Sequence, residues 1–572
     1  MMKNFSFLII VIISIFSIIN VTPSYAQKLK PGPQDLCFFS KVDETDQPYA
    51  VYVPRNYEES KKYPLVIFLH GAMSNHRLGL RRVFGEGNIQ GLDFIKPGNV
   101  PVETDLEATR YWPELKDVPY VVAAPYARGT AGYQGIPEED VYQMLDDIKS
   151  RFSIDEDRIY LTGLSMGGGG TIWLGLTRPE VWAAIAPCCP APPAESAELA
   201  CNVSNLPVHL FVGDKDFLYK TALEWKTKFE TYSPMVNYVE YPGVGHNSWE
   251  WAYKDGFIFE WFSQFKRNLF PEQVRFATRW FKYNKAYWVK FDNITPGTLA
   301  TIDAKFTAQN TIDVTTNSLE AFTLSLEGHP LFNSARKVII KVDGKSFSLQ
   351  TGNAASFTKT AKGWVNTKFT PSLTSKKQGA EGPLYAAVSS NHVYVYGTGG
   401  NPSQEELSAR RAQAAAAADW AADRGMMGRI MIFPRVLSDK EVRQSDFETS
   451  NLILFGTRET NAIIEKFADK LPIHLKNDAV KDYGLVYIFP MNDHYFLVNS
   501  GLAWWTPPKK SEQPTGYNFM NLKAEILKNY KDFILFRESP DNIVSHGYFD
   551  NLWKLPQDAA DAMKVTGVIE IK

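Results

Sequence analysis

Residues 158–170 read RIYLTGLSMGGGG, and within them Gly163, Ser165 and Gly167 form a Gly-x-Ser-x-Gly motif. A short, apolar, β-prone run precedes the motif and a helix-compatible run follows it. A strand that turns sharply into a helix strains its corner residue, and the residues two positions away must lack side chains because backbones approach closely there. The motif therefore predicts that the Ser165 hydroxyl stands exposed at a strand-to-helix corner.

The sequence around the motif alternates between strand and helix patterns. Residues 137–152 have helical apolar spacing with acidic residues in the first turn, and residues 46–53 are typical of an extended strand. Other runs are apolar on both faces, as buried parallel strands are, at residues 65–69, 120–124, 182–186 and 208–212. This alternation predicts an α/β fold with a parallel sheet and functional residues at the carboxyl ends of its strands. The long interval between the first two runs predicts an insertion near the site.

Two further segments carry candidate partners for Ser165. Residues 213–216 read GDKD after a predicted strand, and His246 lies in a glycine-rich loop that leads into a predicted amphipathic helix ending near residue 270. Acyl transfer needs a nucleophile, a base that takes its proton and an acid that holds the base. The order Ser165, acid, His246 is the α/β-hydrolase order. We predict Asp216 as the acid, because a Gly-x-x-Asp spacing places it at the loop tip while Asp214 can cap the turn.

The developing oxyanion needs hydrogen-bond donors as well. We predict the backbone N–H groups of Met166 and Ala72, the second from the turn that follows residues 65–69. His70 is interpreted as a residue that shapes this turn and not as a base. No cysteine or histidine spacing is typical of a zinc site, and the sequence predicts neither a metal nor a cofactor.

Residues 45–268 resemble the α/β-hydrolases of the prolyl-oligopeptidase and poly(hydroxybutyrate)-depolymerase-like esterase group. The residues that carry the resemblance are 69–71 (LHG), 155–168 (DEDRIYLTGLSMGG), 213–216 (GDKD) and 245–246 (GH). The resemblance implies a Ser-His-Asp acyl-enzyme mechanism. It leaves the substrate open, since the group includes peptidases, feruloyl and acetyl-xylan esterases and polyester depolymerases. The C-terminal half resembles a companion region of some bacterial members, and its role is unknown.

Three hypotheses on function follow. The first is a carboxylesterase that acts on esterified plant polysaccharide, like feruloyl or acetyl esterases, and the second is a serine peptidase of the prolyl-oligopeptidase type. The peptidase branch normally carries a β-propeller before the catalytic domain, and this chain has only a short segment there. The third is a non-catalytic binding protein, which an intact set of triad residues disfavours. Aromatic residues near the predicted site suit an aryl acyl group or an ordinary core: Tyr126, Tyr133, Trp249 and Trp251.

The N-terminus predicts export. Lys3, the apolar residues 5–19 and the sequence Ser24-Tyr25-Ala26 are typical of a secretory signal peptide over residues 1–26, although the apolar run is long enough to remain as an anchor. We therefore expect a secreted or periplasmic protein without a stable membrane span after cleavage. The formal net charge of −2, without long charged runs, indicates no nucleic-acid partner. The cysteines at 37, 188, 189 and 201 leave open a disulfide between 188 or 189 and 201, or buried free thiols.

The remaining sequence predicts two more domains after an α/β-hydrolase domain at residues 27–275. Alternating strands and an Asp343-Gly344 turn indicate a small β-rich module at residues 280–375. Strand and helix patterns then resume, predicting a second α/β domain of unknown role at residues 380–572. Its expected helix covers residues 402–423, and its expected strands are 393–396, 430–433, 452–455, 485–489, 495–498 and 533–536. The turn at 397–400 (GTGG) only partly resembles a nucleotide-binding loop, and tight strand-to-helix packing is favoured.

Overall fold

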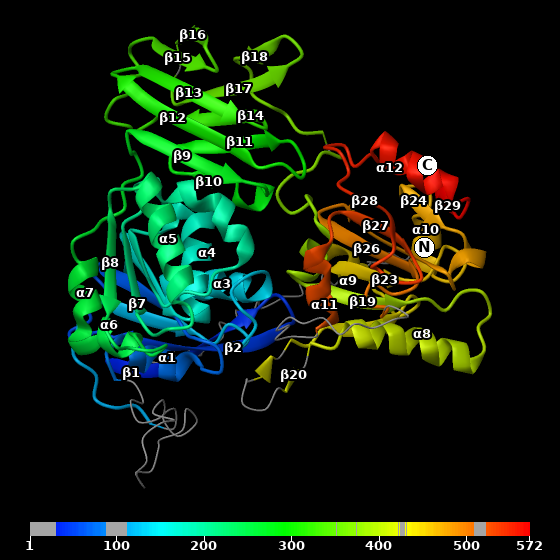
Figure 1. Ribbon diagram of the computed structural model, residues 1–572, viewed down its shortest axis with the longest axis horizontal. Coiled ribbons are helices and arrows are strands. Elements are labelled where there is room, and N and C mark those ends of the chain that lie inside the picture. The colour runs from blue at the N-terminus through cyan, green and yellow to red at the C-terminus, as the bar shows by residue number, and fades with distance from the viewer. Residues whose placement is uncertain are drawn as a thin grey trace, which may run out of the picture.

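The structure is a computed structural model that describes residues 30–86, 111–350, 352–372, 374–420, 422–423, 429–430, 432–507 and 522–572. The predicted signal peptide, and residues 87–110 of the predicted insertion, lie outside the described residues. Figure 1 shows a large sheet formed by the first half of the chain, an all-strand unit above it, and a third unit of strands and helices beside both.

The first sheet has eight strands in the order β1-β2-β4-β3-β5-β6-β7-β8. Strands β4, β3, β5, β6, β7 and β8 run parallel, while β1 and β2 add an antiparallel edge. The bounds are β1 (Gly32–Ser40), β2 (Thr45–Val53), β3 (Tyr63–Leu69), β4 (Val121–Pro125), β5 (Ile154–Leu164), β6 (Ala184–Cys188), β7 (Val208–Gly213) and β8 (Val236–Tyr241). The sequence thus predicted the central strands within a few residues.

Helices cover both faces of this sheet, so its central strands are apolar throughout. In β3, Leu65, Ile67 and Leu69 pack into the core of one face, while Val66 and Phe68 pack into the core of the other. The first face is covered by α3 (Ile136–Arg151), α4 (Met166–Thr177) and α5 (Tyr219–Tyr232). The second is covered by α1 (His76–Val83), α6 (Trp249–Ala252) and α7 (Phe257–Phe262). A shift of the β3 register by one residue would therefore move each of these side chains into the opposite core.

The helix predicted after the His246 loop, ending near residue 270, is wrong in its length and continuity. The chain forms two short helices, α6 and α7, and the second ends at Phe262. Asp255 and Gly256 between them have left-handed φ values of 57° and 72°, which interrupt a regular helix. The spacing of apolar residues in this segment does not indicate the interruption.

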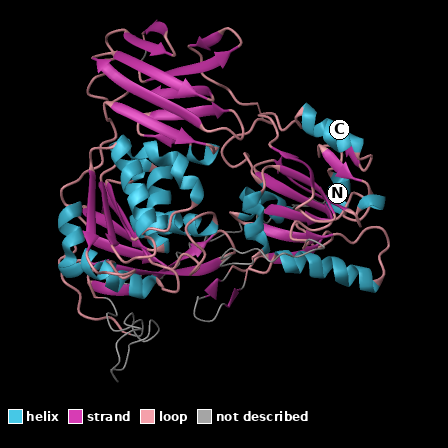
Figure 2. Cartoon of the chain, viewed as in Figure 1, coloured by secondary structure: helices cyan, strands magenta, loops and turns pink. Residues whose placement is uncertain are grey.

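The all-strand unit consists of two five-stranded sheets, which Figure 2 shows as strands above the helices of the first unit. Their orders are β10-β11-β14-β17-β18 and β16-β15-β13-β12-β9. Strand β9 pairs with β12, so strand pairing in this unit begins at Gln273, before the predicted residue 280. The bounds are β9 (Gln273–Thr278), β10 (Lys285–Ala286), β11 (Val289–Ile294), β12 (Ala300–Ala308), β13 (Thr311–Asn317), β14 (Leu319–Ser325), β15 (Val338–Val342), β16 (Lys345–Leu349), β17 (Ala354–Thr360) and β18 (Gly363–Val365).

The third unit is built on a seven-stranded sheet of order β22-β19-β23-β26-β25-β27-β28. Strands β22, β19, β23 and β26 are parallel, and β25, β27 and β28 extend the sheet in antiparallel pairs. The bounds are β19 (His392–Tyr396), β22 (Arg435–Ser438), β23 (Asn451–Phe455), β25 (Tyr483–Met491), β26 (His494–Gly501), β27 (Phe533–Arg537) and β28 (Ile543–Gly547). The edge strand of this sheet is β22 and not the strand predicted at 430–433. Of the described residues in that range, Ile430 ends the two-residue strand β21 (Arg429–Ile430), and residues 432 and 433 lie outside strands.

Short elements complete the third unit. Its helices are α8 (Gln404–Ala417), α9 (Gln444–Thr449), α10 (Ala462–Lys466), α11 (Lys523–Ile526) and α12 (Gln557–Val565). Two small strand pairs are β20 (Ala422–Asp423) with β21, and β24 (Ile473–Leu475) with β29 (Ile569–Ile571). Among the helices of the described residues, none has both the length and the apolarity that a membrane span requires.

The glycine turn after β19 is a packing turn. A Cβ atom added to Gly397 would lie 2.0 Å from the Thr460 carbonyl oxygen, so only glycine fits there. The Asp439 carboxylate accepts hydrogen bonds from the Thr398 N–H (3.0 Å) and the Ala462 N–H (2.8 Å). Asp439 thus joins the glycine turn to the start of α10, which agrees with the packing interpretation.

The third unit shares apolar contacts with the first. Val42, Ala131 and Ile136 are buried in the same hydrophobic cluster as Leu384 and Tyr394. Burial of one large aliphatic side chain contributes about 1.5–3 kcal/mol. The two halves of the chain therefore stabilise each other, although the predicted domain boundaries stay a prediction.

Candidate active site

Ser165 occupies the corner between β5 and α4. Its φ of 53° and ψ of −115° are strained for a residue with a side chain. A Cβ atom added to Gly163 would lie 2.5 Å from the Gly167 carbonyl oxygen, and one added to Gly167 would lie 2.0 Å from the Leu69 carbonyl oxygen. The two glycines of the motif are therefore required by backbone contacts, as the sequence predicted.

His246 and Asp216 lie beside this serine. His246 Nε2 is 2.9 Å from Ser165 Oγ, and His246 Nδ1 is 3.0 Å from each carboxylate oxygen of Asp216. The Asp216 side chain is fully buried, and its Oδ1 also accepts the Leu218 N–H at 2.8 Å. The structure thus brings together the three residues that the sequence predicted, in the order carboxylate, imidazole, hydroxyl.

The electrostatics of this group favour a basic imidazole. Burial alone lowers the pKa of His246, but the hydrogen bond and charge of Asp216 outweigh burial and raise the pKa above its ordinary value. The buried Cys189 thiol also lies close to His246, and burial raises its pKa well above the ordinary range. That thiol is neutral near pH 7, so the carboxylate is the charge that acts on the imidazole.

Asp214, the alternative acid, has a different position. Its Oδ1 accepts the Gly243 N–H at 2.7 Å, which joins the loop after β7 to the loop that carries His246. In the same place, a Cβ atom added to Gly213 would lie 2.2 Å from the Val244 carbonyl oxygen. Asp214 therefore braces the two loops against each other, while Asp216 is the residue that reaches the imidazole.

Of the two predicted oxyanion donors, Met166 directly follows Ser165, and Ala72 lies in the turn whose Gly71 approaches Ser165. Met166 is the first residue of α4, where a backbone N–H has no partner within the helix. Ala72 follows Gly71, whose added Cβ atom would lie 3.5 Å from Ser165 Cβ. Its other neighbour, Met73, donates its N–H to Thr130 Oγ1 at 3.0 Å. The positive end of the α4 dipole also favours negative charge at this corner.

His70 is buried beneath the same turn. Its Nδ1 lies 2.8 Å from the Gly71 carbonyl oxygen and its Nε2 lies 2.9 Å from the Tyr126 carbonyl oxygen. Burial lowers the pKa of His70. Both ring nitrogens contact backbone, which agrees with a residue that shapes the turn.

A buried ion cluster supports the loop that carries Thr130. The guanidinium of Arg128 is fully buried and contacts Asp43 (2.6 Å) and Asp140 (2.5 Å). Ala127 and Arg128 have φ values of 45° and 61°, so this loop is held in a strained conformation. The sequence does not predict this cluster, because its members lie far apart in the chain and follow no motif.

Phe217 is a second residue that the sequence analysis missed. Its side chain is 76% exposed, and its ring centroid lies 4.4 Å from that of His246. The sequence feature that could have indicated Phe217 is its position directly after Asp216. Of the aromatic residues predicted near the site, Trp249 lies edge-on to His246, with ring centroids 5.4 Å apart. Tyr133 is buried, and its hydroxyl donates to the His70 carbonyl oxygen.

The other two predicted aromatic residues lie further out. Tyr126 stacks on His70 with a centroid distance of 6.4 Å, and Trp251 packs on Tyr241 at 6.3 Å. An exposed aromatic ring beside the imidazole therefore comes from Phe217 and not from these residues.

The four cysteines are free thiols. Cys189 donates its thiol to the His246 carbonyl oxygen at 3.5 Å and so contacts the histidine loop. Within the described residues, Cys189, Asp216 and His246 are the one group with metal-ligating atoms close together. Both imidazole nitrogens of His246 are already hydrogen-bonded, to Asp216 and Ser165, so the group does not fit a metal site.

This arrangement can transfer a proton from a hydroxyl to an imidazole. The strained corner carries the half-buried Ser165, the imidazole lies within hydrogen-bond distance of its Oγ, and a buried carboxylate holds the imidazole. Those are the parts that nucleophilic acyl transfer needs.

Comparisons with known proteins find one family match and several similar solved structures. Residues 40–261, which contain Ser165, Asp216 and His246, match a family model described as "Putative esterase". Among solved structures, the chain is similar to a thermostable esterase, with 24% identity and a TM-score of 0.31; the alignment covers 41% of this chain and 63% of that one.

Two further similarities are of the same kind. A CE1 ferulic acid esterase from Anaeromyces mucronatus has 21% identity and a TM-score of 0.28, with 40% of this chain and 90% of that chain covered. An S-formylglutathione hydrolase from Staphylococcus aureus has 18% identity and a TM-score of 0.30, with 41% of this chain and 99% of that chain covered. The family match is confined to residues 40–261 and does not extend over the rest of the chain.

Proposed function

We propose that this protein is a serine hydrolase that cleaves carboxylic esters, with Ser165 as nucleophile, His246 as base and Asp216 as the acid that holds the base. The observation that carries the proposal is the 2.9 Å contact between His246 Nε2 and Ser165 Oγ at a strained strand-to-helix corner. The esterase family match over residues 40–261 supports the choice of ester as substrate.

The reaction follows from the geometry. Ser165 Oγ attacks the ester carbonyl carbon while its proton moves to His246 Nε2, and Asp216 stabilises the resulting imidazolium. The N–H groups of Met166 and Ala72 stabilise the negative oxygen of the tetrahedral intermediate. The intermediate then expels the alcohol, which takes the proton from Nε2 and leaves an acyl-enzyme. Water, activated by the same imidazole, releases the acid and regenerates Ser165.

Phe217 supports an apolar or aryl acyl group. An exposed aromatic ring loses contact with water when a ligand covers it, and this one lies 4.4 Å from the base. We therefore propose aryl esters of the feruloyl type ahead of acetyl esters, with a plant polysaccharide as the alcohol in both cases. The variant Phe217→Ala should raise KM for methyl ferulate by about tenfold and change KM for p-nitrophenyl acetate little.

Three finer assignments belong to the same proposal. Residues 45–268 are placed in the prolyl-oligopeptidase and poly(hydroxybutyrate)-depolymerase-like group on the motifs given above. A secreted or periplasmic location is supported by the signal-peptide pattern of residues 1–26. The C-terminal half is proposed as a non-catalytic companion.

Hydrolysis assays with Ser165→Ala test the proposal directly. Wild-type protein should hydrolyse p-nitrophenyl acetate and methyl ferulate and should be labelled covalently by a fluorophosphonate. Both properties should disappear in Ser165→Ala and persist in Ser153→Ala, which changes a serine just before the opposite end of β5. Labelling that survives in Ser165→Ala would mean that another residue is the nucleophile.

The same assay separates the other hypotheses. Proline-containing peptide p-nitroanilides should be hydrolysed far more slowly than the esters. Faster cleavage of the peptides would make the protein a serine peptidase. If the wild-type protein hydrolyses none of these substrates, the hypothesis of a non-catalytic binding protein is favoured.

A further inference from the structure

A large cavity lies between the three units, apart from the proposed ester site. Its volume is about 890 Å³, within the range of about 300–1,000 Å³ that is common for small-molecule sites. Ser165, Asp216 and His246 are not among its lining residues. The lining combines Trp173 and Arg178 of the first unit, residues 279–283 of the connection to the all-strand unit, and side chains of the third unit.

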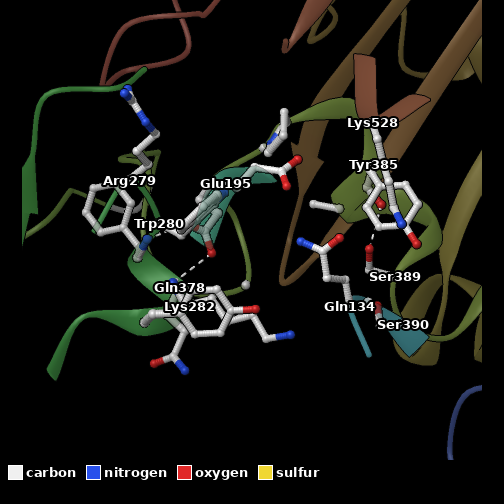
Figure 3. A pocket seen from close by; sticks show the side chains of 18 of the residues that line it. Gln134, Glu195, Arg279, Trp280, Lys282, Gln378, Tyr385, Ser389, Ser390 and Lys528 are labelled. Atoms are coloured by element: carbon white, nitrogen blue, oxygen red, sulfur yellow. Dashed lines mark hydrogen bonds between the residues drawn. The ribbon is translucent and has the colours of Figure 1, made fainter. Parts of the chain in front are cut away.

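Aromatic rings line this cavity on opposite sides. Figure 3 shows Trp280 and Lys282 on one side and Tyr385 and Lys528 on the other. Tyr530 and Tyr548 from the third unit also contribute to the lining, and both side chains are half-buried. Rings that are partly open to a cavity offer flat faces on which the C–H groups of a ring-shaped ligand can pack.

Four basic side chains of the lining have acidic partners, and a fifth, Arg178, lies over the Tyr142 ring at 4.1 Å. Arg279 Nη2 lies 2.7 Å from Glu198, Lys282 lies 2.8 Å from Glu139, and Lys528 lies 2.5 Å from Glu525. Lys376 is paired with the buried Asp532. Charges that are paired in this way do not attract a polyanion such as a nucleotide, because neutralised groups offer little net field.

Neutral polar groups fill the spaces between the rings. Gln134 and Gln378 come from opposite sides of the cavity in Figure 3, and Ser389 and Ser390 lie beside Tyr385. Amides and hydroxyls can donate and accept hydrogen bonds without charge. Ser389 and Ser390 already have partners in Tyr385 and Asn451, but a purely apolar ligand such as an acyl chain would offer no hydrogen bond to the two amides, which costs free energy.

We propose that this cavity binds a neutral saccharide of one or a few sugar rings. A saccharide combines apolar C–H faces, which pack on aromatic rings, with hydroxyl groups that bond to amides, serines and paired charges. The three units form the site together, which gives the C-terminal half a binding role. This inference is independent of the proposed ester chemistry, because it can be tested by binding alone.

Full-length Ser165→Ala protein is suited to the test, since an ester-cleaving nucleophile is absent. Xylotetraose, cellotetraose and mannotetraose would be titrated separately and followed by calorimetry. We expect at least one to bind with a Kd of about 1 mM or tighter. Ala197→Trp, which places a bulky ring on an exposed lining residue, should abolish this binding. The matched control Ala361→Trp alters an exposed residue between β17 and β18 and should bind normally.

A second variant protects the test against misfolding. Trp280→Ala should weaken binding by about tenfold, because it removes one aromatic face. The control Trp251→Ala removes an exposed tryptophan outside the lining and should not weaken it. Equal thermal denaturation midpoints for the variants would show that the fold is intact.

Three outcomes would overturn the inference. One is the absence of binding by each of the tetrasaccharides at about 10 mM. Another is saccharide binding that Ala197→Trp and Trp280→Ala leave unchanged, which would place the ligand elsewhere. The third is binding of inorganic phosphate that Ala197→Trp abolishes, which would make the cavity an anion site.

Discussion

Replacing Asp216 by asparagine changes the tautomer of His246. The Leu218 N–H donates to Asp216 Oδ1 at 2.8 Å, and this contact requires an oxygen in the variant as well. The amide NH₂ of asparagine then takes the position of Oδ2, which lies 3.0 Å from His246 Nδ1. A donor in that position favours an imidazole that carries its proton on Nε2, where Ser165 needs a lone pair.

The expected loss is large and confined to catalysis. A triad that holds the wrong tautomer loses about 10³–10⁴-fold in kcat, or about 4–5.5 kcal/mol at about 1.36 kcal/mol per factor of ten. Asparagine has nearly the same shape as aspartate, and the Asp216 side chain is fully buried, so the fold should persist. We would measure kcat on p-nitrophenyl acetate and the thermal denaturation midpoint of the same preparations.

Asp214→Asn is the matched control. Asp214 Oδ1 accepts the Gly243 N–H at 2.7 Å, and an asparagine oxygen can accept the same bond. The variant should keep kcat within a few-fold and lose at most about 1 kcal/mol of stability. If Asp214→Asn loses the activity and Asp216→Asn keeps it, the reasoning on the acid is refuted and the two roles must be exchanged.

Three other perturbations have definite expected results. Activity should fall as the pH drops through the pKa of His246, because only the neutral imidazole accepts the proton. Asp216 holds this pKa above its ordinary value of 6.5 despite burial. The midpoint is measured from kcat/KM against pH, and Asp216→Asn should shift this midpoint to lower pH. Gly167→Ala places a Cβ atom 2.0 Å from a backbone oxygen and should cost about 3 kcal/mol in urea denaturation, whereas Gly352→Ala, with no atom within 4 Å, should cost little. A chain ending at Asn268 should unfold at a lower temperature than the full chain, because Ile136 and its apolar neighbours lose their partners.

The sequence predicted most of the first sheet because its strands are apolar on both faces. Val66 and Phe68 point to one core and Leu65, Ile67 and Leu69 to the other, and a continuous apolar run of this length is typical of a strand covered on both faces. The need for glycine at positions 163 and 167 could also be predicted from the motif, since the backbone of the corner leaves no room for a side chain there. Such local constraints are written into short stretches of sequence.

Contacts between distant segments were not predictable in the same way. Arg128 meets Asp43 and Asp140 only once three separate segments have folded together, and no spacing indicates this. The helix after His246 was predicted too long, because its apolar spacing continues through Asp255 and Gly256, where the backbone is left-handed. Tertiary packing decided both features.

The ion cluster around Arg128 links the C-terminal half to the proposed oxyanion turn. Asp43 accepts the Phe433 N–H at 3.1 Å and binds Arg128, which lies two residues before Thr130. Thr130 in turn holds the N–H of Met73. A chain that lacks the C-terminal half loses the Phe433 contact but keeps Arg128, Asp140 and Ser165 in place. The kcat of this shortened chain therefore tells whether the C-terminal half only stabilises the fold or also positions the oxyanion turn. If it only stabilises the fold, kcat stays intact at low temperature. If it positions the turn, kcat falls at temperatures where the fold is still intact.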